Sequence, residues 1–173
     1  MTVVLIVLGV IIAVLVIPSM SGMVARHRVQ GVQAELLGDL QLARSEQAQR
    51  NGTSTSVAVS FGSNEAVTCY TIHTVGGALC DCTRAPGTAC TGVADAQEIK
   101  TMQFERAVGV SVAASSPGGG SLVFAPPKGL VTPADVVIDV QSATRGQLRT
   151  SISATGVPSV CSPDGSILGV RTC

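Results

Sequence analysis

An uncharged apolar segment near the N-terminus, VVLIVLGVIIAVLVI at residues 3–17, limits most strongly what this chain can fold into. A soluble helix keeps a polar face beside its apolar stripe, and this segment has none. A cleaved secretory signal carries basic residues before its apolar part, whereas the first basic residue here is Arg26. As a helix, residues 1–18 would span roughly 27 Å, slightly less than the ~30 Å hydrocarbon core of a bilayer. The segment therefore predicts a transmembrane helix over residues 1–18.

The helical pattern continues past Pro18 as an amphipathic segment, predicted over residues 19–52. Its apolar residues recur at spacings of three and four and form one stripe: Val29, Val32, Leu36, Leu40 and Ala43. Glu46 and Arg50 form a favourable i,i+4 pair, and Asn51-Gly52 is typical of a helix end. We expect one long helix, kinked at Pro18, whose second half packs on a globular domain.

Residues 53–173 change to short β-rich segments separated by Gly and Pro, and are predicted to form a β-rich head domain. Residues 55–61 and 66–74 flank a Gly-Ser-Asn turn and predict a hairpin. Further strands are expected near residues 99–104, 108–113, 122–124, 136–140, 148–154 and 157–161, with turns at 117–120 and 126–129. The pattern predicts an α+β fold, in which a long N-terminal helix packs on an antiparallel sheet or small sandwich.

All six cysteines lie in the predicted head domain, and none lies in the apolar segment. An even count in a domain rich in Gly, Ser and Thr favours disulfides in an oxidising compartment. The alternative is a metal site at Cys80, Cys82 and Cys90, but their spacing does not match common zinc knuckles. A turn at residues 163–165 predicts a Cys161–Cys173 bridge. The other four then pair among themselves, and Cys80 and Cys82 each join one of two partners: Cys69 or Cys90.

The sequence gives no support for an enzyme, a metal site or a cofactor. It contains no Gly-rich phosphate loop, no zinc-binding His-x-x-x-His and no Gly-x-Ser-x-Gly elbow. His27 is expected to face solvent or headgroups, and His73 to be a half-buried structural histidine. Asp135 and Asp139 share a strand face, which we interpret as solvated.

The chain carries 11 basic and 11 acidic residues, so its formal net charge is zero. A balanced chain has no strong field that attracts nucleic acid. The weak candidates for a DNA contact are scattered cations, which are usually surface solubilisers: Lys128, Arg145, Arg149 and Arg171.

Two stretches carry a family resemblance. LLGDLQLARSEQAQRNG at residues 36–52 ends the predicted helix, and a Gly-x-x-x-x-Cys-Ser-Pro segment occupies residues 156–163. The plan of the chain resembles the minor type IV pilins and pseudopilins of the FimT/GspH kind. The resemblance implies a pilin-like fold, in which the first half of the helix bundles in a filament core and the second half packs on the head.

This chain departs from the family pattern in two places. The basic leader, the cleavage-site Gly and the Phe-Thr-Leu-x-Glu that follows it in the family are missing, and we expect that the start as given is truncated. Some FimT proteins bind DNA through a C-terminal Gly-Arg-x-Arg, where this chain has Gly156-Val157-Pro158-Ser159. Because Val157 and Ser159 supply no cation, DNA binding in that mode is disfavoured.

The resemblance implies a structural subunit that starts or caps type IV pilus assembly. Its partners would be other pilins, and it would lie in the bacterial inner membrane with a periplasmic head before it joins the pilus. The alternatives are a DNA-uptake pilin and a GspH-like pseudopilin of type II secretion, against which the six cysteines argue mildly. The expected helix-packing residues are Val3, Leu5, Val10, Ile12, Val14, Ile17 and Pro18.

Overall fold

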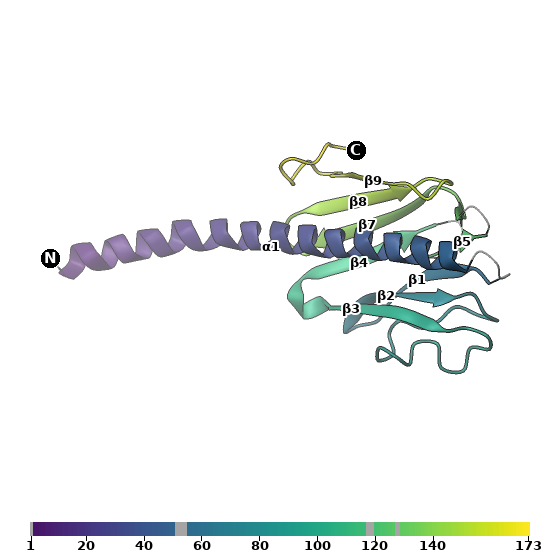
Figure 1. Ribbon diagram of the computed structural model, residues 1–173. Coiled ribbons are helices and arrows are strands. Elements are labelled where there is room, and N and C mark those ends of the chain that lie inside the picture. The colour runs from purple at the N-terminus through teal and green to yellow at the C-terminus, as the bar shows by residue number, and fades with distance from the viewer. Residues whose placement is uncertain (1, 51–54, 117–119, 127–128) are drawn as a thin grey trace.

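The computed structural model describes residues 2–50, 55–116, 120–126 and 129–173, with side chains from residue 22 onward. One helix, α1 (Thr2–Gln49), runs without interruption for 48 residues, through position 18. Its first part extends away from the head, and its second part lies against it (Figure 1). The expected helix stop at residues 51–52, the turn at 117–119 and Lys128 lie outside the described residues.

In the described residues, nine strands follow the helix and form two antiparallel sheets. The five-stranded sheet has the order β3-β2-β1-β5-β6, and the four-stranded sheet has the order β4-β7-β8-β9. Their bounds are β1 (Val57–Ser63), β2 (Val67–Thr74), β3 (Glu98–Glu105), β4 (Val110–Ser115), β5 (Ser121–Ala125), β6 (Leu130–Thr132), β7 (Val136–Ser142), β8 (Gln147–Ile152) and β9 (Pro158–Cys161). A 3-10 turn, η1 (Arg106–Val108), joins β3 to β4. The expected α+β class is confirmed, and β6 is the strand that the sequence did not predict.

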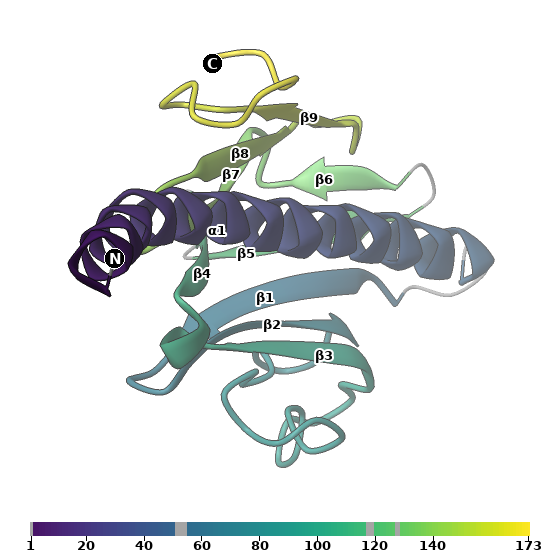
Figure 2. The same cartoon turned by 90° about the vertical axis from the view of Figure 1, so that its left-hand side faces the viewer.

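Helix α1 lies over the junction of the two sheets. In the view of Figure 2, β1, β2 and β3 lie on one side of the helix and β7, β8 and β9 on the other. Strands β1 and β2 form the expected hairpin, in register from Val57↔Thr74 to Ser63↔Thr68. The helix therefore closes a core between itself and both sheets.

The apolar stripe of α1 meets that core as predicted. Val29, Leu36 and Ala43 are fully buried, Leu40 is nearly so, and Val32 packs at the edge. On the sheets, alternating inward residues of β1, β7 and β8 complete the core. The predicted pair between Arg50 and Glu46 is also present, with Arg50 Nη2 3.2 Å from Glu46 Oε2.

The predicted transmembrane part of the helix, residues 1–18, lies outside the side chains that the structure describes. Among the residues that were described and searched, no helix reaches the length and apolarity needed to cross a membrane.

The six cysteines form three disulfides, which confirms that they are oxidised in this fold. Cys161 is joined to Cys173, Cys69 to Cys82, and Cys80 to Cys90. Two of these bridges hold residues 75–97 between β2 and β3, which we call the stapled loop. The third holds the segment after β9.

Candidate functional site

Strand β2 is buried on both faces, and this arrangement organises the stapled loop and the helix around it. From Thr68 to Thr74 every residue of the strand is buried. Because side chains alternate along a strand, Tyr70 and Ile72 face α1, whereas Cys69, Thr71 and His73 face the stapled loop. One face therefore carries large apolar groups, and the other carries polar and sulfur groups.

The stapled loop covers its face of β2 through cross-links. Cys82 is bound to Cys69 on the strand, and Cys80 and Cys90 close a smaller ring within the loop. Both Cys80 and Cys82 are buried, and so is Ala89. Gly62 on β1 makes this close approach possible, because a Cβ there would lie 3.0 Å from Cys82 Sγ.

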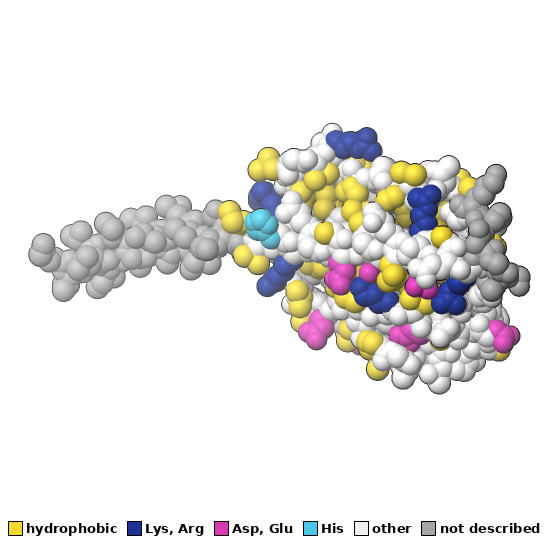
Figure 3. Space-filling view, in the orientation of Figure 1, with side chains coloured by type: hydrophobic (Ala, Val, Ile, Leu, Met, Phe, Trp, Pro, Cys, Tyr) yellow, Lys and Arg dark blue, Asp and Glu magenta, His cyan; other side chains and the backbone are white. Residues whose placement is uncertain are grey.

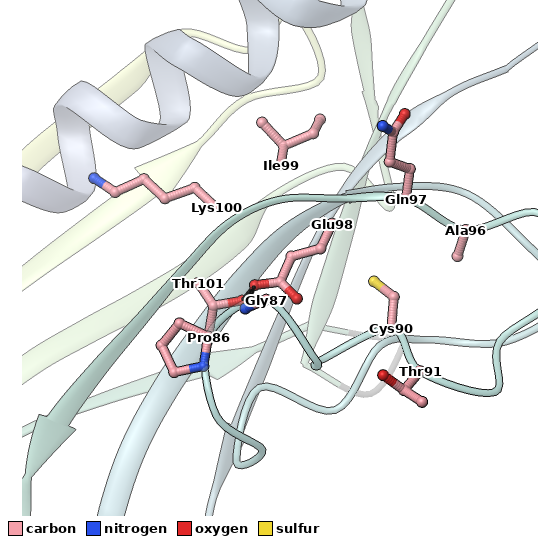
Figure 4. Close-up of a pocket in the computed structure, with 10 residues that line it drawn as sticks. All are labelled: Pro86, Gly87, Cys90, Thr91, Ala96, Gln97, Glu98, Ile99, Lys100 and Thr101. Atoms are coloured by element: carbon pink, nitrogen blue, oxygen red, sulfur yellow. Dashed lines mark hydrogen bonds between the residues drawn. The ribbon is translucent and has the colours of Figure 1, made fainter.

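Glu98, at the start of β3, ties the stapled loop to the sheet by hydrogen bonds. Its carboxylate accepts from Gly87 N at 2.7 Å, Ala89 N at 2.9 Å and Thr101 Oγ1 at 2.6 Å. Figure 4 shows Glu98 pointing towards Gly87, whereas Lys100 points towards the helix. Burial opposes ionisation, but the three hydrogen bonds outweigh it, so the pKa of Glu98 lies below its usual value.

A β-bulge explains why Glu98 and Lys100 face opposite sides. The register of β2 and β3 shifts between Ile72 and His73, so that Ile72 opposes Lys100 but His73 opposes Glu98. In a regular strand, residues 98 and 100 would share one face. The bulge thus gives β3 one carboxylate for the loop and one ammonium for the helix.

The hollow beside the loop has a volume of about 610 Å³ and is lined by residues 86, 87, 90, 91 and 96–101.

His73 is fully buried, whereas the sequence predicted a half-buried side chain. Its Nδ1 donates to Thr74 O at 2.9 Å, which leaves Nε2 to accept from Ser60 Oγ at 2.6 Å. Burial lowers the pKa of His73, since desolvation disfavours the charged ring. The ring lies near the sulfurs of Cys80 and Cys90, but both sulfurs are engaged in their disulfide and offer no thiolate to a metal.

A charged cluster fixes the helix on the other face of β2. Tyr70 Oη donates to Asp39 Oδ2 at 2.8 Å, and Lys100 Nζ lies 2.7 Å from Asp39 Oδ1. Glu35 Oε1 lies 3.7 Å from the same ammonium. Burial raises the pKa of Tyr70, and its hydrogen bond to Asp39 adds to the effect. Asp39 lies on the buried side of α1. The sequence prediction of the buried face used only apolar residues, so it missed this cluster.

Three of the weak candidates for a DNA contact lie in the part of the chain that the structure describes: Arg145, Arg149 and Arg171. Arg149 is held by Asp139, with Nε–Oδ1 at 2.8 Å and Nη2–Oδ2 at 3.0 Å, and both side chains are partly exposed, so the strand face that was interpreted as solvated carries an ion pair. Arg145 and Arg171 are exposed, in the β7–β8 turn and near the C-terminus. Asp135 has a left-handed φ of 61° before β7. His27 is exposed, as expected.

In the segment Gly156-Val157-Pro158-Ser159, the first two residues precede β9 and the last two begin it, with Val157 exposed. Three of its residues line a hollow of about 190 Å³ together with Phe124, Ile152 and residues of α1: Leu40, Gln41 and Arg44. Arg44 places one cation beside this turn, which the local sequence did not indicate. The hollow is small and mostly apolar, and it lies between the helix and strands β5, β8 and β9.

The expected helix-packing residues, at positions 3–18, lie outside the described side chains. Comparisons of the chain with protein-family models, curated proteins and solved structures gave no match.

Proposed function

We propose that this chain is a minor subunit of a type IV pilus, with a structural role in the assembly or priming of the filament. One observation carries the proposal. A 48-residue helix holds a disulfide-linked head on its second half, and its first half extends away from the head (Figure 1). That free half includes the uncharged apolar residues 3–17.

The physical logic of such a subunit lies in the two halves of the helix. The second half buries its apolar stripe against the head, so it exposes little apolar surface to partner subunits. The first half can exchange lipid for the helices of other pilins, because both surroundings are apolar. Three disulfides suit a head exposed to an oxidising compartment outside the cytoplasm. The pilin-like fold and the FimT/GspH resemblance belong to this proposal.

The first test is the amount of surface pili sheared from cells that lack the gene, compared with the complemented strain. Loss of pili in the deletion strain supports the assembly role. Normal pili in that strain contradict it and leave DNA uptake and type II secretion as the functions to assay.

A charge in the free half of the helix tests the mechanism. Val10→Asp should abolish incorporation into pili, because a charge at the centre of an apolar helix bundle is costly. Val10→Leu is the matched control and should incorporate normally. Incorporation of Val10→Asp at the wild-type level would show that this part of the helix does not pack in the filament core.

A further inference from the structure

Four segments meet at the end of the head from which α1 emerges, and we call this end the helix-exit face. They are residues 22–28 of α1, residues 106–109, residues 143–146 and residues 164–171. Arg28 Nη1 donates to Val108 O at 3.0 Å, and Ala143 N donates to Gly109 O at 2.9 Å. A Cβ at Gly146 would lie 3.6 Å from Arg26 Cγ and 3.4 Å from Ile167 Cδ1. Figure 2 views this face, with η1 on one side of the helix and the loop after β9 on the other.

In the part of the chain that the structure describes, the arginines of the helix-exit face have no acidic partners. Five of the eleven basic residues lie here, namely Arg26, Arg28, Arg106, Arg145 and Arg171. Among the residues that the structure describes, none of the five forms an ion pair. Elsewhere on the head Arg50, Arg84, Lys100 and Arg149 are each paired with a carboxylate.

Acidic residues are fewer at this end than basic ones. They are Glu65 in the β1–β2 turn, Glu105 beside η1 and Asp164 in the last loop. The carboxylate of Asp164 already accepts hydrogen bonds from Ser162 and Ser166. The chain is neutral overall, but five basic and three acidic residues give the helix-exit face an excess of positive charge.

The same face exposes large apolar side chains. Leu168 is 87% exposed and Met23 is 62% exposed, and Val24 and Val108 are also exposed. Leu168 is firmly held, because its neighbour Ile167 is buried in the core and the Cys161–Cys173 bridge closes its loop. In Figure 3, yellow and dark blue side chains surround the described start of the helix.

We propose that the helix-exit face docks on the headgroup layer of an anionic lipid bilayer. Arginines supply contacts to lipid phosphates, and the exposed apolar side chains enter the boundary between headgroups and acyl chains. The docking would hold the head at the membrane before it joins a filament. This inference rests on the proposed function, because a membrane-inserted first half of α1 brings this face to the surface.

Lipid fits this face better than nucleic acid does. A nucleic acid backbone would use the arginines, but phosphate contacts give no role to Leu168, Met23 or Val108. A lipid surface uses both kinds of side chain at once. The face also borders the apolar part of α1 along the chain, so a bilayer would already be next to it.

A single tryptophan reports on the docking, because the chain contains none. The full chain with Leu168→Trp is reconstituted in phosphatidylcholine vesicles with or without phosphatidylglycerol. Brominated lipids should quench the fluorescence, and they should quench it more in the anionic vesicles. Leu130→Trp is the matched control, since Leu130 is exposed outside the helix-exit face, and it should not be quenched.

Charge neutralisation then tests the arginines. Arg145→Gln and Arg171→Gln are added to the chain that carries Leu168→Trp. Each lost arginine should lower the ratio of docked to undocked heads about fivefold near an anionic surface, so the pair should lower it by about thirtyfold. High salt should weaken docking in the same direction. Arg44→Gln, beside the β8–β9 turn, should change nothing.

The outcomes separate this proposal from the proposed function. If the chain floats with the vesicles but Leu168→Trp is not quenched, the head does not dock. The membrane insertion of the first half of α1 would still be supported. If the chain does not float with the vesicles, both proposals are overturned. If duplex DNA changes the fluorescence of Leu168→Trp and anionic vesicles do not, the face binds nucleic acid and the lipid proposal is wrong.

Discussion

The two faces of β2 are equally buried, yet they are covered by different means. On one face, Tyr70 and Ile72 belong to the same hydrophobic core as Leu36 and Leu40 of α1. On the other, the stapled loop covers Cys69, Thr71 and His73 with two disulfides and the hydrogen bonds of Glu98. A helix offers a continuous apolar stripe, whereas a Gly-rich loop has few apolar side chains to bury. The loop therefore depends on covalent and polar links where the helix depends on the hydrophobic effect.

The largest effect is expected on the helix face. Leu36→Ala removes a fully buried side chain from the core and should lower the free energy of unfolding by about 3.5 kcal/mol, measured by denaturant titration. Leu37→Ala, on the adjacent and partly exposed position, should cost less than about 1 kcal/mol. Equal losses for the two variants would mean that the stripe does not hold the helix to the head.

The loop face should respond to loss of its disulfide, by a different route. Cys69→Ala with Cys82→Ala opens a link across 13 positions and should cost about 3 kcal/mol. Hydrogen exchange should become faster at residues 78–92 in particular. Cys161→Ala with Cys173→Ala is the control, and it should leave exchange in the stapled loop unchanged. Unaltered loop exchange without the Cys69–Cys82 bridge would mean that the polar contacts alone cover this face.

Titration of His73 gives the loop face a pH dependence in mildly acidic solution. The pKa of His73 is lowered in the folded chain, so the unfolded chain binds the proton first as pH falls. The neutral ring of His73 makes its full contribution to the free energy of unfolding above an ordinary histidine pKa of about 6.5. Below that pH, the free energy of unfolding should fall by up to about 1.4 kcal/mol per pH unit. The loss ends once pH passes through the lowered folded pKa.

Unfolding curves at several pH values check this expectation. His73→Gln should abolish the pH dependence between about pH 6.5 and 5.5, whatever its effect on stability at neutral pH. His27→Gln, at an exposed position, should retain it. A wild-type chain whose stability is flat across this range would contradict the assignment of a buried neutral ring to His73.

The helix face could be predicted from sequence far better than the loop face. The period of the apolar stripe is a local property, and it identified Val29, Leu36 and Ala43 before the structure did. The alternating pattern of β7 was equally legible. Polar residues carry no such period, so the burial of Gln33, Asp39 and Gln47 on α1 could not be foreseen.

Features that depend on pairing between distant segments were also missed. Strand β6 has three residues, and its existence depends on a ladder with β5 and not on its own composition. The bulge that turns Glu98 towards the loop is set by the register of β2 against β3. The local sequence Glu98-Ile99-Lys100 is typical of a regular strand and gives no indication of the bulge.

The smallest expected effect tests that bulge. Glu98→Gln keeps a side-chain oxygen for one loop amide but removes the charged acceptor shared by Gly87, Ala89 and Thr101. The substitution should lower the free energy of unfolding by about 1 kcal/mol near neutral pH. Because the folded pKa of Glu98 is lowered, its contribution is complete above an ordinary glutamate pKa of about 4.3 and is lost as pH falls through the folded value. The difference between wild type and variant should therefore shrink in acid. Glu105→Gln, exposed at the other end of β3, should have little effect at any pH. If the two variants behaved alike, the carboxylate would be a bystander, and the loop would be held by its disulfides alone.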